Sequence, residues 1–83
     1  MIEGYPKIGN TVKVEVKEIL KMGVLVSLLE YNKEGLIIFS EFSRRPIPSP
    51  DKVIKVGEQF SAIVINKDEE KGYIDLSKRR IMP

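Results

Sequence analysis

The sequence predicts an all-β domain that folds as a small closed barrel of five strands. Five segments rich in β-branched and aromatic residues alternate with turns that contain glycine, asparagine, aspartate or proline. The chain has 83 residues, 42% of them hydrophobic, and it contains neither cysteine nor histidine. A chain of this length holds one hydrophobic core. We therefore expect a single domain over residues 1–83 that aliphatic packing stabilises without disulfides.

The first strand carries the clearest pattern, and a second strand follows it. From residue 12 to residue 17, valine alternates with lysine or glutamate, which is the period of a strand buried on one face. This pattern predicts a strand from Thr11 to Ile19. A turn is predicted at Lys21-Met22-Gly23, and the β-branched residues that follow predict a second strand over residues 24–29.

A short third strand is predicted over residues 36–39, because residues 31–35 have the composition of a turn. Ser40 then favours a helical turn over residues 40–43, since its hydroxyl can accept from backbone amides as an N-cap. These three strands predict a meander.

The next segment differs in kind, because Pro46, Pro48 and Pro50 fix φ and remove amide donors. Such a segment cannot join a central ladder of hydrogen bonds. We predict that residues 40–55 form an exposed loop rich in serine, arginine and proline, with one helical turn near residues 51–54.

Residues 60–65 and 73–77 predict the fourth and fifth strands, joined by a polar turn over residues 67–72. Closing five strands into a barrel removes the exposed edges that invite aggregation. The oligonucleotide-binding (OB) barrel is the nearest architecture of this size, whereas a β-sandwich usually needs about seven strands.

Composition excludes several functional classes. Without histidine and cysteine, the chain lacks the usual general base and the commonest zinc ligands. No glycine-rich phosphate loop occurs, and the acidic run at residues 68–70 is better explained as a solvated hairpin tip than as a magnesium site. We expect no enzyme activity, cofactor or metal. Because no apolar stretch approaches the length of a membrane span, a cytoplasmic protein is expected. The net charge of +2 permits nucleic-acid contact without demanding it.

Several strings resemble a known family. The strings are KMGVLVSLLEYNKEG, SEFSRR and EKGYIDLSKRR. They are similar to the amino-terminal S1-type RNA-binding OB barrel of the alpha subunit of translation initiation factor 2, from archaea or eukaryotes. The resemblance covers residues 5–81, and KGYIDLSKRR is its most specific part. The chain ends at Pro83, before the family's helical and carboxy-terminal domains, so an excised domain and a stand-alone mimic both remain open.

The resemblance implies a non-catalytic RNA-binding and regulatory module. In the family, the factor carries initiator methionyl-tRNA to the small ribosomal subunit. The implied partners are initiator tRNA, mRNA or rRNA, the beta and gamma subunits and, in eukaryotes, the exchange factor and kinases. Basic residues that suit solvated phosphate contacts occur along the chain. The predicted RNA-binding residues are Lys13, Lys21, Arg44, Arg45, Lys78, Arg79 and Arg80. The expected binding surface on the second and third strands is aliphatic at Val24, Leu25, Ile37 and Ile38, so base stacking should be weak.

Ser43 matches the family's regulatory phosphorylation site. The two arginines that follow it could pair a phosphate. The loop reads SRRPIPSP where eukaryotic members tend to read SRRRIRS, so Pro46 and Pro48 replace two arginines. This replacement lowers the local positive charge and stiffens the loop.

A second matching segment corresponds to the family's kinase-docking surface, which here would comprise Lys71, Gly72, Tyr73 and Asp75. An ordinary hairpin would also favour this pattern, because glycine permits the turn and the residues after it alternate.

Two alternatives belong to other classes. A free-standing pseudosubstrate would occupy a kinase of the initiation factor through the docking segment, although such mimics tend to lack the serine that is present at residue 43. An RNA-processing nuclease has only the shared barrel in its favour, and a shared fold does not establish a function.

Overall fold

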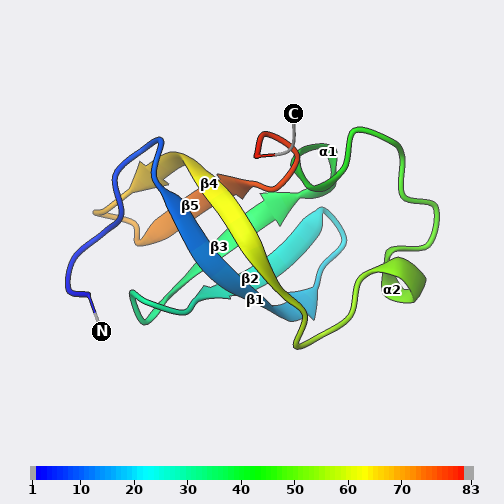
Figure 1. The fold of residues 1–83 in the computed structure, drawn as a ribbon, viewed down its shortest axis with the longest axis horizontal. Helices are drawn as coiled ribbons and strands as arrows, with labels where there is room; N and C mark the ends of the chain where they lie inside the picture. The colour runs from blue at the N-terminus through cyan, green and yellow to red at the C-terminus, as the bar shows by residue number, and fades with distance from the viewer. Residues whose placement is uncertain (1, 82–83) are drawn as a thin grey trace.

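The computed structural model describes residues 2–81 and contains five strands and two single-turn helices (Figure 1). The elements follow the chain in the order β1 (Thr11–Ile19), β2 (Gly23–Leu28), β3 (Lys33–Ile38), α1 (Phe39–Phe42), α2 (Pro50–Val53), β4 (Gln59–Asp68) and β5 (Tyr73–Ser77). The predicted all-β, five-stranded fold is therefore confirmed, and each predicted strand overlaps an observed one.

The strands form a closed barrel in the order β1-β2-β3-β5-β4. All neighbouring pairs are antiparallel except β3 and β5, which run parallel where Leu36 faces Asp75. Strand β1 pairs with both β2 and β4, so this strand joins the two ends of the sheet. Its ladder with β2 shifts register between Val16 and Glu18, a bulge that bends the strand around the barrel.

The interior of the barrel is aliphatic. Alternate residues of β1 are buried, as the period-two pattern predicts. The buried hydrophobic residues of the described chain are Val12, Val14, Val16, Val24, Val26, Leu28, Ile37, Phe42, Ile54, Ala62, Val64, Ile74 and Leu76. Gly23 is needed where β2 passes β3, because a Cβ atom at this position would lie 2.3 Å from the backbone oxygen of Ile37.

The connection from β3 to β4 leaves the barrel and carries α2 at its far end (Figure 1). It is anchored by three buried side chains, those of Glu41, Phe42 and Ile54. The first helical turn begins one residue before the predicted one. Its N-cap position is Ile38, and no side chain caps it, so the prediction that Ser40 acts as the N-cap is wrong.

Strand β3 also begins earlier than predicted, at Lys33. The sequence from Tyr31 to Gly35 looks like a turn, but the chain reverses within fewer residues because Asn32 adopts a left-handed conformation with φ of 55°. Lys33 and Glu34 can then pair with β2. The predicted start of this strand was too late because these two polar residues look like part of a turn.

Candidate nucleic-acid interface

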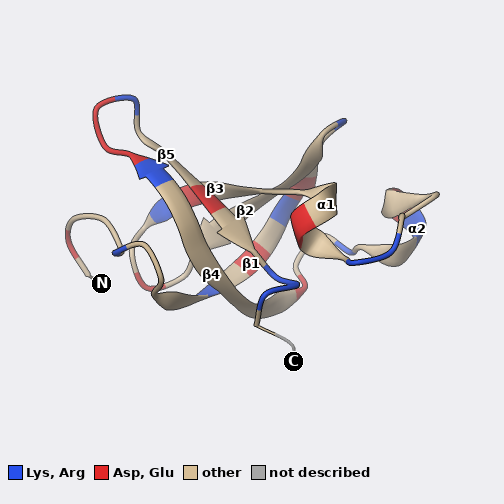
Figure 2. Ribbon diagram, turned by 90° about the horizontal axis from the view of Figure 1, so that it is seen from above, with Lys and Arg blue, Asp and Glu red and all other residues tan. Residues whose placement is uncertain are grey.

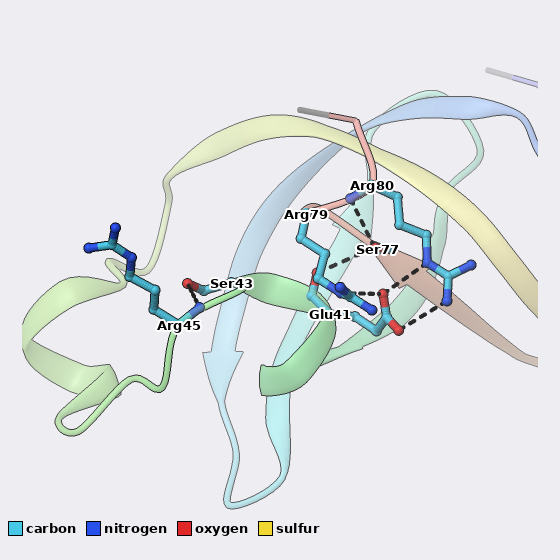
Figure 3. Close-up of polar contacts among 6 residues, drawn as sticks. All are labelled: Glu41, Ser43, Arg45, Ser77, Arg79 and Arg80. Carbon is cyan, nitrogen blue, oxygen red and sulfur yellow. Dashed lines mark hydrogen bonds and ion pairs between the residues drawn. The ribbon is translucent and has the colours of Figure 1, made fainter. Parts of the chain in front are cut away.

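The segment that follows β5 is bound to α1 through the backbone of Glu41. The amides of Lys78 and Arg79 both donate to the carbonyl oxygen of Glu41, each at 3.0 Å. The buried hydroxyl of Ser77 donates to the same oxygen at 3.4 Å. Figure 3 shows Glu41 beside Ser77 and Arg79, although α1 and β5 are far apart in the sequence. The helical turn and the basic segment are therefore one structural unit.

The carboxylate of Glu41 strengthens this unit with charged contacts. Arg80 donates from Nε to Oε1 and from Nη2 to Oε2, both at 3.1 Å. Arg79 donates from Nε to Oε1 at 3.2 Å (Figure 3). Hydrogen bonds from Arg80 and then from Ser77, with a smaller contribution from Arg79, lower the pKa of Glu41 to about 2, although burial acts in the opposite direction. The carboxylate is therefore ionised at any physiological pH.

Lys78 also contacts the protein itself. Its ammonium nitrogen lies 4.6 Å from the ring centroid of Phe42 and 4.9 Å from that of Phe60. The two rings meet edge to face at 5.5 Å. This geometry allows a cation–π interaction with both rings. The three basic residues of the KRR string, predicted as solvated RNA contacts, thus all have protein partners, which no local sequence pattern could have indicated.

The other predicted basic residues are presented from different elements. Arg44 and Arg45 are exposed in the connection after α1, and the hydroxyl of Ser43 accepts the amide of Arg45 at 3.1 Å. Lys21 is exposed in the turn between β1 and β2. This turn contacts α1, because the amide of Phe39 donates to the carbonyl oxygen of Met22 at 3.2 Å.

Only Lys13 of the predicted set lies in the wall of the barrel, on β1, where it is exposed. In Figure 2, basic segments lie on the α1–α2 connection and on the segment after β5. Most of the predicted RNA-binding residues are therefore gathered around α1.

The outward face of β2 and β3 is partly aliphatic, and only part of the predicted set contributes to it. Val24 and Ile37 point into the core and are fully buried. Leu25 is half-buried and Ile38 is 43% exposed. This face carries Leu25, Leu36 and Ile38 beside the polar Ser27 and Glu34, and neither β2 nor β3 contains an aromatic residue.

Of the predicted docking residues, Lys71 and Gly72 lie in the turn between β4 and β5, and Tyr73 and Asp75 lie on β5. Gly72 has φ of 81°, which favours glycine, and its amide donates to the Asp68 oxygen at 2.7 Å. Lys71 is exposed, Tyr73 is 45% exposed and Asp75 is half-buried. The turn thus has a structural reason for its glycine, while the tyrosine is accessible to a partner.

The acidic run belongs to the same turn. The carboxylate of Asp68 accepts the amides of Glu70 and Lys71, each at 3.1 Å, as in an ordinary polar turn. Within residues 2–81, no cluster of three or more acidic side chains could hold a metal ion. None of the helices in this part of the chain is long and apolar enough to cross a membrane.

Comparisons with known proteins agree with this architecture. A translation initiation factor 2 subunit alpha homolog from Arabidopsis thaliana is 55% identical over 78 residues, which are 93% of this chain and 23% of the relative. A subunit 1 of the same factor from Dictyostelium discoideum is 51% identical over 95% of this chain and 24% of the relative. The chain thus spans about a quarter of the length of the curated relatives it matches.

Among solved structures, the a/eIF2alpha–aDim2p–rRNA complex from Pyrococcus horikoshii contains a similar chain. The TM-score is 0.88 at 36% identity, with 95% of this chain and 48% of that chain covered. The family model described as the S1 RNA binding domain matches residues 5–79. Because this match spans nearly all of the barrel, the chain belongs to the S1 RNA-binding domain family.

Proposed function

We propose that the chain is a non-catalytic RNA-contacting module of a translation initiation factor 2 alpha subunit. Its similarity to alpha subunits from plants, amoebae and archaea supports a role in initiation. The observation that carries the proposal is the gathering of basic residues around α1 on an S1-type barrel. In this role the module helps the factor to deliver initiator methionyl-tRNA, with tRNA, mRNA or rRNA of the small ribosomal subunit as the RNA partner.

The proposed mode of binding is attraction of charge without recognition of bases. Lysine and arginine contacts to phosphates add affinity that falls as salt rises, and they carry no sequence information. The aliphatic face of β2 and β3 adds little stacking, because Leu25 and Ile38 stand where aromatic side chains would be needed.

Fluorescence anisotropy with a labelled single-stranded RNA, measured at rising salt, tests this mode of binding. Each phosphate contact contributes a slope of about −0.7 in a plot of log affinity against log salt. We expect weak binding with a slope equivalent to several contacts, and equal affinities for different sequences. Tight, salt-insensitive or sequence-selective binding would contradict the proposal.

Regulation through Ser43 is a further part of the proposal. The serine is half-buried beside Arg45, and a phosphate on its hydroxyl would add a charge of about −1.5 to −2 next to two arginines. The accessible Tyr73 and the exposed Lys71 lie on a hairpin well separated in sequence from the serine. They suit docking of a kinase, because a preformed hairpin loses little ordering entropy on binding.

A further inference from the structure

A cavity of about 460 Å³ lies between the connection after α1 and the segment after β5. Three arginines from these two segments line it, together with two serines and three apolar side chains. The lining residues are Phe39, Ser40, Ser43, Arg44, Arg45, Pro46, Ile47 and Arg79. Its lining contains no acidic residue, although the chain as a whole carries 12 acidic residues against 14 basic ones. The lining therefore carries three basic side chains, of which Arg79 is paired with the adjacent carboxylate of Glu41.

Arg79 is held at the edge of this cavity by its neighbour Glu41. The carboxylate of Glu41 accepts only the Nε–H of Arg79, whereas it accepts two bonds from Arg80. A guanidinium carries five N–H donors in a fixed fork, so its terminal nitrogens remain available for a further acceptor. Because one edge of the fork is fixed, Arg79 loses little side-chain entropy when it binds a ligand.

The opposite side of the cavity is also ordered before any ligand arrives. The Ser43 hydroxyl accepts the amide of Arg45, which fixes the turn that presents this arginine (Figure 3). Pro46 follows immediately, and its locked φ restricts the backbone at the rim. Residues from two segments far apart in the sequence thus line one space, although the Arg45 side chain points away from Arg79 in Figure 3 and has to turn toward it to share a ligand.

We propose that this cavity binds a phosphate of a single-stranded RNA backbone, a site that rests on the proposed RNA-binding function and locates it. Guanidinium forks match the oxygen geometry of phosphate, and serine hydroxyls add neutral donors. The cavity is much larger than one phosphate group, so the chain can continue on both sides of it. This site lies beside α1, and its lining includes neither Leu25 nor Ile38 of the β2–β3 face. Arg80, which Glu41 binds through two hydrogen bonds, is a structural residue and does not line it.

The experiment is a titration of the ¹⁵N-labelled 83-residue chain with a short oligouridine at low salt, combined with binding measurements on variants. We expect the largest amide shifts at Ser43, Arg44, Arg45, Ile47 and Arg79, since Pro46 has no backbone N–H. The variant Arg45→Ala should bind about fivefold more weakly, the loss of one partly exposed charged contact. Lys52→Ala removes the same charge from an exposed position on α2 that does not line the cavity, and its loss should stay below about twofold.

A double-mutant cycle tests whether the two segments hold the same phosphate. Two independent sites that each lost about fivefold in RNA affinity would together lose about twenty-five-fold. If the two arginines hold the same phosphate, the double variant Arg45→Ala and Arg79→Ala should lose only about tenfold. The pair Arg45→Ala and Lys13→Ala is the additive control, because Lys13 lies on β1 outside the cavity. If Arg79→Ala fails to fold, the comparison of RNA affinities between Arg45→Ala and Lys52→Ala still tests whether the cavity binds RNA.

Three outcomes would overturn the proposal. Equal losses of RNA affinity for Arg45→Ala and Lys52→Ala would show that RNA is attracted by overall positive charge and not by this cavity. The proposed RNA-binding function would still hold. Amide shifts with inorganic phosphate but none with RNA would identify a site for a free anion. An absence of any RNA binding would remove the proposed function and this site together.

Discussion

Replacing Glu41 by glutamine should separate α1 from the segment after β5. In the native protein the carboxylate accepts two bonds from Arg80 and one from Arg79. Glutamine keeps the shape of the side chain, but it removes the charge and turns one acceptor oxygen into a donor that faces a guanidinium. A 12% exposed side chain has little access to replacement water, so the lost bonds are not recovered from solvent.

The magnitude follows from the pKa of Glu41, which its partners lower from 4.5 to about 2. Unscreened, this difference corresponds to about 3 kcal/mol of unfolding free energy at neutral pH. The side chains of Arg79 and Arg80 are 37% and 52% exposed, so solvent screens part of this electrostatic stabilisation. We therefore expect Glu41→Gln to lower the unfolding free energy by about 1.5–2 kcal/mol near pH 7.

The contribution of Glu41 to the unfolding free energy depends on pH in a defined direction. Because folding lowers the pKa of Glu41, its stabilisation is complete above about pH 4.5 and is lost as the pH falls toward about 2. Urea unfolding of the native chain and Glu41→Gln should show the largest difference in unfolding free energy near pH 7 and a much smaller one at about pH 2.5.

Glu34→Gln is the matched control. Its ion pair with Lys17 joins side chains that are 47% and 55% exposed, so it should cost less than about 0.5 kcal/mol. Equal stability of Glu41→Gln and the native chain near pH 7, or a difference that persists unchanged in acid, would refute this account.

Three further predictions concern the barrel, the basic segment and the loop. Gly23→Ala should lower the unfolding free energy by about 1–3 kcal/mol, because the new methyl group would lie 2.3 Å from a backbone oxygen of β3; an unchanged thermal midpoint would contradict the close approach. Lys78→Gln should lose about 0.5–1 kcal/mol in urea unfolding, because it removes the cation above two phenylalanine rings, and an unchanged midpoint would show that this contact contributes nothing. Incubation with a eukaryotic stress-response kinase should add phosphate to the native chain, none to Ser43→Ala and less to Tyr73→Ala, as followed by mass spectrometry; undiminished incorporation in either variant would refute that residue's role.

The sequence predicted the barrel well because its strands follow a local rule. Valine alternates with charged residues in β1, and this period alone identifies the buried face. Aliphatic segments bounded by turns located the other strands, and the long third connection identified the barrel type. Local composition failed where tertiary contacts decide the outcome, as at Lys33, which looks like turn but pairs with β2.

The site was harder to predict than the fold. Glu41 and Arg80 are 39 residues apart, and nothing near either one indicates that they bind each other. A KRR string looks like a solvated basic patch, whereas Lys78 packs over two rings. The sequence correctly placed Arg44 and Arg45 at the surface, because prolines keep their segment out of the sheet. That Arg79 borders the same cavity follows only from the folded chain.

The central claim is that this barrel binds RNA through phosphates and not through bases. Its most direct test compares the affinity of the chain for an oligouridine with that for an abasic strand of the same length and the same backbone charge. The account predicts affinities within about twofold, since phosphate contacts carry the binding. Base stacking contributes about 1–3 kcal/mol per base where it occurs. A loss of tenfold or more on removing the bases would therefore contradict the claim.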